Sequence, residues 1–165
     1  TFRPNRSQRR TWRRNADLSV SLEPPAYRRE HFALYKRYQQ QRHPGGEMDF
    51  EDPADYARAC LESPVDTRLV TFRDRPGRLL AVAITDFLEA GLSAMYTFFE
   101  PEAAKRSLGT YAILWQVEYA REQGLPHVYL GYWVRECAKM AYKSQFRPAE
   151  VWTGQAWRTL SPDEG

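Results

Sequence analysis

Three cationic side chains follow one another at intervals of four residues near the C-terminal end of the chain, namely Lys139, Lys143 and Arg147. If this segment is helical, the spacing places all three along one edge of the helix. Ammonium and guanidinium groups arranged in this way can bind a carboxylate or a phosphate through charge-assisted hydrogen bonds. A solvated helix face has the same pattern, so the spacing by itself leaves both interpretations open.

The hexapeptide RSLGTY forms a second candidate site, because it stands directly before the longest predicted helix. Arg106, Ser107, Gly109 and Thr110 lie where that helix begins. The first backbone N–H groups of a helix have no partner within the helix, and its dipole is positive at this end. A glycine here lets a ligand approach the backbone closely, so a phosphate or carboxylate could bind. The alternative is an ordinary helix start.

Four further residues, each outside these two motifs, are candidates for a functional site. Asp86 ends a continuous apolar run, LLAVAIT, where a carboxylate is costly unless it has partners, so it could hold an ammonium group or accept its proton. Its alternative role is that of a strand-end residue in a turn. His43 closes a predicted helix, where the dipole favours positive charge, and could equally be structural. Tyr96 and Tyr132 could line the same cleft as Asp86 or belong to the core.

The first 14 residues contain six arginines and no acidic residue, whereas the net charge of the whole chain is only +3. The rest of the chain is therefore mildly acidic and carries a basic N-terminal segment. Such segments are typical of proteins that bind the phosphate backbone of nucleic acids, although a solvated tail has the same composition. The candidate phosphate-binding residues of this segment are Arg6, Arg9, Arg10, Arg13 and Arg14.

The remaining composition excludes several classes of protein. The two cysteines, Cys60 and Cys137, are far apart and belong to no CxxC or Cys/His motif, which excludes a zinc ribbon, an iron–sulfur cluster and a disulfide framework. This usage suits a reducing cytosol and predicts no metal site. No apolar run approaches the roughly 20 residues of a membrane-spanning helix, so a membrane protein is excluded. A chain of 165 residues predicts one main domain.

The apolar periodicity predicts one α/β domain with a mixed, mostly antiparallel sheet flanked by helices. Three consecutive strands joined by short Gly-containing turns form its centre. The expected strands are 17–22, 68–73, 79–87, 92–99, 127–131 and a final hairpin of 150–153 with 156–160, and the expected helices are 27–43, 53–62, 108–123 and 135–143. We expect a cleft where the strands before and after the helix 108–123 diverge.

Several separate motifs resemble one family. They are RSQRRTWRRNADL, LYKRYQQQRH, DFL, SAMY and YLGYWVRECAKMAYKSQFRPAE. Together they are similar to the aminoacyl-tRNA-protein transferases, and most to the bacterial aspartate/glutamate leucyltransferases, which are kin to the arginyl-tRNA-protein transferases. The resemblance runs through residues 1–160 and implies a GNAT-like fold. The cysteine-bearing N-terminal domain of that family has no counterpart here, so residues 1–16 are interpreted as a basic arm or linker and 17–165 as the transferase domain.

The resemblance implies transfer of leucine, with arginine as the alternative, from charged tRNA to the α-amine of proteins that begin with Asp or Glu. Such transfer marks proteins for degradation by the N-degron pathway in the cytoplasm. Aminoacyl-tRNA is then a co-substrate, and no cofactor is expected. An α-amine has a pKa of roughly 7.7–8.0, so a fraction is neutral at pH 7 and no potent base is needed. Positioning and oxyanion stabilisation should supply most of the rate.

The same resemblance suggests a role for each candidate. Catalysis falls to Asp86, Tyr96 and Tyr132, and binding of the acceptor carboxylate to Lys139, Lys143, Arg147 and His43. The residues Arg106, Ser107, Gly109 and Thr110 would meet the 3′ end of the tRNA, and the arginines of the basic segment would meet its backbone.

Two other functions remain open at this stage. A GNAT acetyltransferase would use acetyl-coenzyme A, although Tyr111 stands where the phosphate-binding loop of that fold has a small residue. A non-catalytic tRNA-binding module would bind tRNA whether or not it is charged. A product assay with charged tRNA separates these alternatives.

Overall fold

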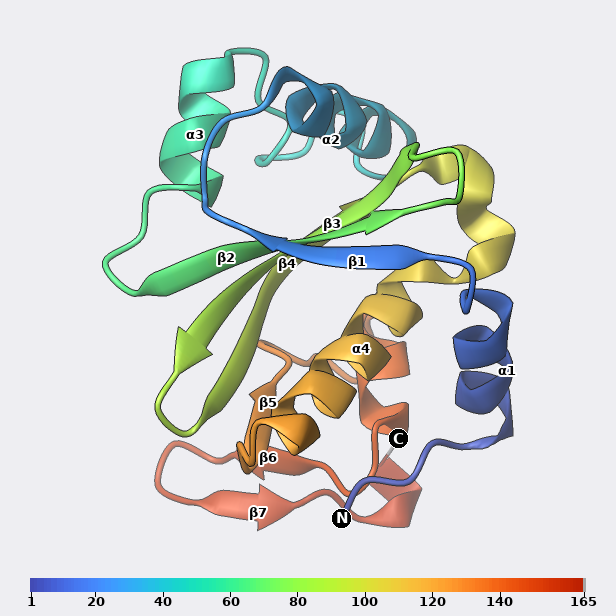
Figure 1. Ribbon diagram of the computed structural model, residues 1–165. Helices are drawn as coiled ribbons and strands as arrows, with labels where there is room; N and C mark the ends of the chain where they lie inside the picture. The colour runs from blue at the N-terminus through green and yellow to red at the C-terminus, as the bar shows by residue number, and fades with distance from the viewer. Residues whose placement is uncertain (165) are drawn as a thin grey trace.

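A five-stranded sheet in the order β1-β2-β3-β4-β5 forms the centre of the protein (Figure 1). The structure, a computed structural model, describes residues 1–164. The first four strands are antiparallel neighbours, and β5 pairs parallel to β4. The strands are β1 (Ser19–Glu23), β2 (Asp66–Arg73), β3 (Leu79–Leu88), β4 (Gly91–Phe99) and β5 (His127–Tyr129). The predicted class, a mostly antiparallel sheet flanked by helices, is confirmed.

Helices cover both faces of this sheet, which explains why the central strand β3 is buried from Leu79 to Asp86. On one face lie α2 (Arg29–Arg42) and α3 (Pro53–Cys60). Asp52 caps α3 by accepting a hydrogen bond from the Ala54 N–H, as its position before a proline predicts. An aromatic core of fully buried rings fills this side, with Tyr35, Tyr56 and Phe98 at its centre.

The opposite face carries α4 (Leu108–Glu122), with α1 (Arg6–Arg14) beside it. Phe72 of β2 meets the rings of Tyr111 and Trp115 at centroid distances of 5.6 and 6.2 Å. The short 3-10 helix η1 (Pro101–Arg106) connects β4 to α4. The ring of Tyr111 is buried and belongs to the core on this face of the sheet.

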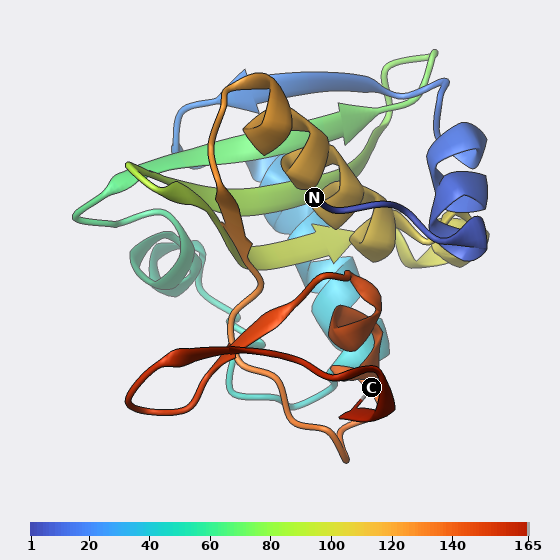
Figure 2. The same cartoon turned by 90° about the horizontal axis from the view of Figure 1, so that it is seen from below.

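The C-terminal part lies against the rest of the molecule as irregular chain and short elements (Figure 2). These are η2 (Ala141–Gln145), β6 (Glu150–Trp152), β7 (Trp157–Thr159) and η3 (Pro162–Glu164). The predicted hairpin near Gly154 is confirmed, but the predicted helix 135–143 is wrong, because turns occupy residues 135–140. Without a long apolar face, this segment gains too little from packing to offset the cost of helix nucleation.

The strands β4 and β5 diverge as predicted. They pair over three residues only, from Gly91 to Ser93 opposite His127 to Tyr129. Gly91 permits this contact, because a Cβ at this position would lie 2.2 Å from the His127 carbonyl oxygen. Beyond the pair, a bulge at Met95 shifts the register between β3 and β4. The second half of β4 is therefore not paired with β5.

No helix within residues 1–164 is long and apolar enough to cross a membrane. The same residues contain no group of three or more His, Cys, Asp or Glu side chains arranged to hold a metal ion.

Candidate active site

Tyr96 lies on β4 directly after the bulge, at the edge where β4 leaves β5. The fully buried Gln39 of α2 donates a hydrogen bond from Nε2 to the Tyr96 hydroxyl oxygen at 2.6 Å. Because Tyr96 accepts this bond, its own proton is available to another acceptor. Burial raises the pKa of Tyr96 to about 12, so the hydroxyl remains a neutral donor at physiological pH.

Three basic residues meet near Tyr96, and we name Arg42, His43 and Lys139 the Arg42 cluster. The Lys139 ammonium donates to the Arg42 carbonyl oxygen at 3.2 Å and lies 3.2 Å from His43 Nδ1. The Arg42 guanidinium lies over the rings of Tyr38 and Phe99, at 5.9 and 5.4 Å from their centroids. The end of α2 and the turn at Lys139 thus form one cationic, aromatic site.

The electrostatics of this cluster are unusual. Burial lowers the pKa of His43, and the charges of Lys139 and Arg42 lower it further. A neutral His43 can accept a hydrogen bond from the Lys139 ammonium through Nδ1. Within residues 1–164, none of the three side chains forms an ion pair with an Asp or Glu. The cluster therefore carries positive charge that the described chain does not neutralise.

The other predicted carboxylate ligands lie elsewhere. Lys143 donates to the Tyr132 carbonyl oxygen at 2.7 Å, and burial lowers its pKa. Arg147 donates to the carbonyl oxygens of Leu160 and Ser161 at 2.8 and 2.9 Å, which fixes the C-terminal segment. The expected alignment of the three cations is wrong, because their segment is not an α-helix. Their binding roles stay predictions.

Asp86 and Tyr132 occupy very different environments. Asp86 is buried on β3, and the Thr67 hydroxyl donates to its carboxylate at 2.5 Å. This hydrogen bond supplies the partner that a carboxylate needs at such a position. The Tyr132 side chain is 90% exposed, so it projects into solvent rather than into the core. Catalytic roles for these two residues stay predictions.

The start of α4 has a backbone suited to binding an anion, but its arginine is already paired. Ser107 adopts a left-handed conformation with φ 54°, and no side chain caps the helix. Arg106 donates to both carboxylate oxygens of Asp17 at 2.9 Å. Gly109 faces Phe99, since a Cβ there would lie 3.5 Å from that ring. Thr110 lies in the first turn of the helix. Because Arg106 is paired, the groups left to bind the 3′ end of a tRNA at this site are the backbone N–H groups, and this role stays a prediction.

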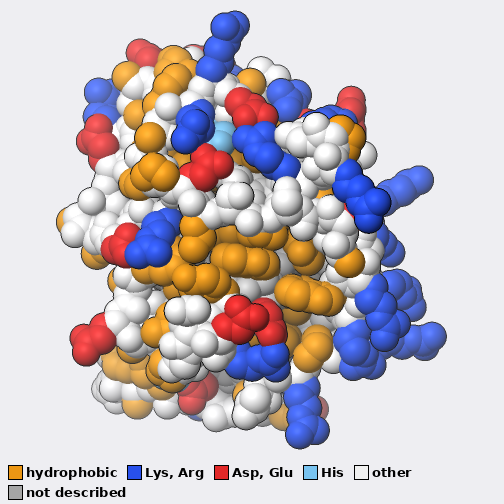
Figure 3. Space-filling model, viewed as in Figure 1, with side chains coloured by type: hydrophobic (Ala, Val, Ile, Leu, Met, Phe, Trp, Pro, Cys, Tyr) orange, Lys and Arg blue, Asp and Glu red, His pale blue; other side chains and the backbone are white. Residues whose placement is uncertain are grey.

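The basic N-terminal segment is a docked helix, α1, rather than an extended arm. Asn5 and Gln8 form a capping box at its start, and Gln8 also donates to the Gln145 carbonyl oxygen at 3.1 Å. The Trp12 ring meets Tyr111 of α4 at 5.4 Å. The arginines predicted to meet the nucleic acid are all exposed, and Figure 3 shows Lys and Arg side chains gathered over this helix: Arg6, Arg9, Arg10, Arg13 and Arg14.

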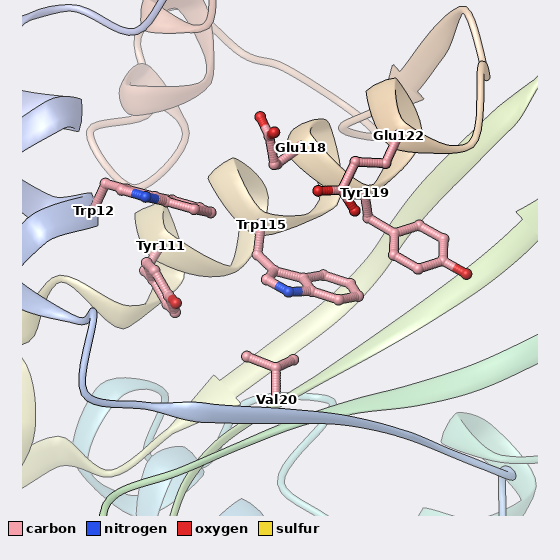
Figure 4. Close-up of a pocket in the computed structure, with 7 residues that line it drawn as sticks. All are labelled: Trp12, Val20, Tyr111, Trp115, Glu118, Tyr119 and Glu122. Atoms are coloured by element: carbon pink, nitrogen blue, oxygen red, sulfur yellow. The ribbon is translucent and has the colours of Figure 1, made fainter.

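Two cavities lie away from the Arg42 cluster. One of about 270 Å³ opens between α1, β1 and α4, where Trp12 and Trp115 stand beside the acidic Glu118 and Glu122 (Figure 4). The two carboxylates make this cavity unsuitable for phosphate. The other, of about 1590 Å³, lies between α4, β5, the N-terminal residues and the C-terminal hairpin, and Lys143 is among its lining residues.

Sequence reasoning missed Arg42, Gln39 and Tyr38 as site residues. The helix pattern contained a signal for Gln39, because it lies four residues after the apolar Tyr35 and so on the buried face. A buried amide among aromatic rings requires a polar partner, which the structure shows to be Tyr96. No signal indicated Arg42, since its neighbour Lys139 is 97 residues away.

The family model described as arginine-tRNA-protein transferase, C terminus, matches residues 30–153. An aspartate/glutamate leucyltransferase of Nitrosococcus oceani is 52% identical over 159 residues, which cover 96% of this chain and 67% of that protein. A protein of the same name from Chromobacterium violaceum is 51% identical over 96% of this chain and 65% of its own length. The chain thus spans about two thirds of the length of these relatives.

One solved structure shows the same fold. It is L-PGS from Bacillus licheniformis, with a TM-score of 0.51 and 15% sequence identity, over 76% of this chain and 39% of that one. At this identity the likeness concerns the fold alone.

Proposed function

The chain belongs to the arginine-tRNA-protein transferase family, and from this premise we propose that it transfers leucine from charged tRNA to the α-amine of proteins that begin with Asp or Glu. The likeness to leucyltransferases over nearly the whole chain carries the proposal. Arginine is the alternative donor, because the family description names it. We further propose that the reaction takes place in the cytoplasm, where its products enter the N-degron pathway.

In the proposed reaction, the amine nitrogen forms a bond to the ester carbonyl carbon of the aminoacyl-tRNA. The bond between that carbon and the ribose oxygen breaks, the amine loses a proton, and the ribose oxygen gains one. The ester is already activated, and part of the amine is neutral near pH 7, so no strong base is required. This chemistry needs alignment of the two substrates and stabilisation of the developing oxyanion.

Tyr96 is suited to stabilise the developing oxyanion. Its hydroxyl is neutral, is held from behind by Gln39, and has a proton to donate at the diverging edge of β4. We propose that this proton is donated to the carbonyl oxygen of the ester as negative charge develops there. A donor that is already oriented costs little reorganisation in the transition state. Gln39 is then a positioning residue, since it acts through Tyr96.

The two substrates would reach this edge from different sides. The exposed arginines of α1 would bind the tRNA backbone, and the uncapped backbone at the start of α4 would meet its 3′ end. Gly109 of α4 and Phe99 of β4 face one another, which connects this donor side to the second half of β4. The acceptor would approach along the end of α2.

The test of this function is a product assay. The full-length protein is incubated with tRNA charged with leucine or, separately, with arginine, together with a peptide that begins with Asp. We expect a peptide extended by one leucyl residue, detected by mass spectrometry, with leucyl-tRNA and not with free leucine plus uncharged tRNA. Acetylation of the peptide by acetyl-coenzyme A, without aminoacyl transfer, would contradict the proposal and favour an acetyltransferase.

A further inference from the structure

The Arg42 cluster differs from the two basic groups in the middle of α2 in having no acidic partner within residues 1–164. Lys36 binds Asp49 and Glu51 at 3.0 and 2.8 Å. Arg37 binds the buried Glu100 at 2.9 Å. The two basic positions in the middle of α2 are thus neutralised, whereas the end of the helix gathers three basic groups that are not. Like charges held together are unfavourable unless an anion joins them.

The cluster is held in place by contacts within the chain, although the side chains of Arg42 and Lys139 are exposed. Lys139 is bound to the end of α2 by its hydrogen bond to the Arg42 carbonyl oxygen. A cation is favourable at this position, because the last carbonyl groups of a helix lack partners and its dipole is negative at this end. The rings of Tyr38 and Phe99 support the Arg42 guanidinium and leave its N–H groups to bind at its edge.

The cluster and the Tyr96 hydroxyl belong to one wall. The Tyr38 ring meets Tyr96 at a centroid distance of 6.3 Å, Phe99 at 4.9 Å and His43 at 5.8 Å. One aromatic ring therefore separates the unneutralised charge from the proposed oxyanion donor. An acceptor whose amine reacts beside Tyr96 would place its first side chain toward Arg42.

We propose that Arg42, supported by His43 and Lys139, binds the side-chain carboxylate of the N-terminal Asp or Glu of the acceptor and so selects acidic N-termini. This inference rests on the proposed function and assigns its acceptor specificity to particular residues. The Arg42 guanidinium supplies two parallel N–H donors, which match the two oxygens of a carboxylate. Lys139 supplies a second charge and holds His43 in the site.

The cluster discriminates by charge rather than by size. An acceptor that begins with Asn or Gln has nearly the same shape, but its amide brings no negative charge to three basic groups and points a donor at one of them. The guanidinium would then lose water without gaining an ionic partner. The charge-assisted hydrogen bonds that a carboxylate would form with the cluster have no equal for an amide, so the difference in affinity comes from charge and not from volume.

His43 adds a pH dependence to this recognition. The groups that face its ring are Tyr38 and Arg42 of α2 and Lys139 of the distant turn 138–140, and both cations disfavour its protonation. A bound carboxylate offsets these charges and raises the pKa of His43 in the complex, so the imidazole takes up a proton on binding. Affinity for an acidic acceptor then falls as the pH rises through that pKa, whereas affinity for a neutral acceptor does not.

The test compares the variant Arg42→Gln with Arg29→Gln, a change of the same residue type at the other, exposed end of α2. The kcat/KM of transfer is measured for peptides that differ only in beginning with Asp or Asn. For Arg42→Gln we expect kcat/KM with the Asp peptide to fall roughly 10- to 100-fold, while the low value with the Asn peptide stays the same. Lys139→Gln should give a smaller loss in the same direction, and Arg29→Gln no change.

The outcomes separate this inference from the proposed function. If wild type transfers leucine and Arg42→Gln lowers both peptides equally, or neither, the inference is overturned and the function stands. If wild type transfers nothing, the function fails, and direct binding of the Asp and Asn peptides by NMR titration decides about the cluster. Preferential binding of the Asp peptide that Arg42→Gln removes would support the inference, and equal binding would overturn it. Lys139→Gln gives the same comparison if Arg42→Gln does not fold.

Discussion

Two arginines near the diverging strands β4 and β5 differ in whether an acidic residue of the chain neutralises their charge. Arg106, before α4, is held by both carboxylate oxygens of Asp17, and its charge is neutralised within the chain. Arg42, at the end of α2, lies over two aromatic rings beside Lys139 and forms no ion pair within residues 1–164. Arg106 connects two segments of the fold, whereas the guanidinium N–H groups of Arg42 are available to bind an anion. The contacts of a cation, rather than its place in a motif, decide which of these roles it has.

The same distinction separates the three cations spaced four residues apart. Lys143 and Arg147 are occupied by backbone carbonyl groups, and only Lys139 joins other unneutralised charges. The comparison therefore predicts that changes at the occupied residues affect stability, and changes at the unneutralised ones affect substrate binding. Three experiments test this division.

The largest expected effect concerns the tRNA. If Arg106 is committed to Asp17, the exposed arginines of α1 must supply the charge on the donor side. Replacing Arg10 and Arg13 by Gln should weaken tRNA binding roughly tenfold or more near physiological salt, and should flatten the plot of log K against log salt by about 0.9 for each lost phosphate contact. Binding is measured by fluorescence titration at several salt concentrations. The matched change at Arg29 and Arg75 should leave the slope as it is, and an unaltered slope in the first variant would refute this role of α1.

A smaller effect is expected on stability. Arg106→Ala removes a two-pronged, half-buried ion pair and leaves the Asp17 carboxylate without its main partner, which should lower the free energy of unfolding by about 1–2 kcal/mol. Arg42→Ala should lower it by less, about 0.5 kcal/mol, because it removes exposed contacts with the Tyr38 and Phe99 rings but leaves no carboxylate without its partner. Urea unfolding of both variants measures the difference. Equal destabilisation would mean that the two arginines do not differ in the way proposed.

The smallest effect is the pH dependence of that difference. The hydrogen bond from Arg106 lowers the pKa of Asp17 below its ordinary value of 3.8. A lowered pKa contributes stability that is present above the unfolded value and is lost as the pH falls through the folded value. The gap in unfolding free energy between wild type and Arg106→Ala should thus be constant above about pH 5 and shrink below pH 4. A gap that persists at pH 2 would contradict the ion pair as its cause.

Much of the fold follows from local sequence patterns. The apolar run of β3, the Asp-Pro start of α3 and the Gly-containing turns between strands gave elements that the structure contains, because burial on two faces, capping and turn geometry depend on adjacent residues. The prediction of a helix at 135–143 was wrong, because this segment lacks a long apolar face and its conformation depends on distant partners.

The site was predictable only in part. Lys139 and His43 were recognised as possible ligands, but their meeting 96 residues apart depends on the whole fold. The pairing of Arg106 with Asp17, 89 residues away, is equally non-local. Arg147 binds carbonyl groups only 13 and 14 residues further along the chain, but no regular spacing indicates these contacts. The sequence therefore indicated which residue types could bind an anion, and the tertiary contacts determined which of them remain unpaired.

The central claim is that the transfer takes place at the diverging edge of β4, with the Tyr96 hydroxyl as donor to the developing oxyanion. Its most direct test is the single-turnover rate of leucyl transfer at saturating leucyl-tRNA and Asp-starting peptide, measured for wild type and Tyr96→Phe. Loss of one oxyanion donor should lower this rate about 100- to 1000-fold, while tRNA binding stays close to wild type. The free energy of unfolding should fall by only about 1–3 kcal/mol, because the buried Gln39 amide loses its partner. A rate for Tyr96→Phe within twofold of wild type would show that the chemistry takes place elsewhere.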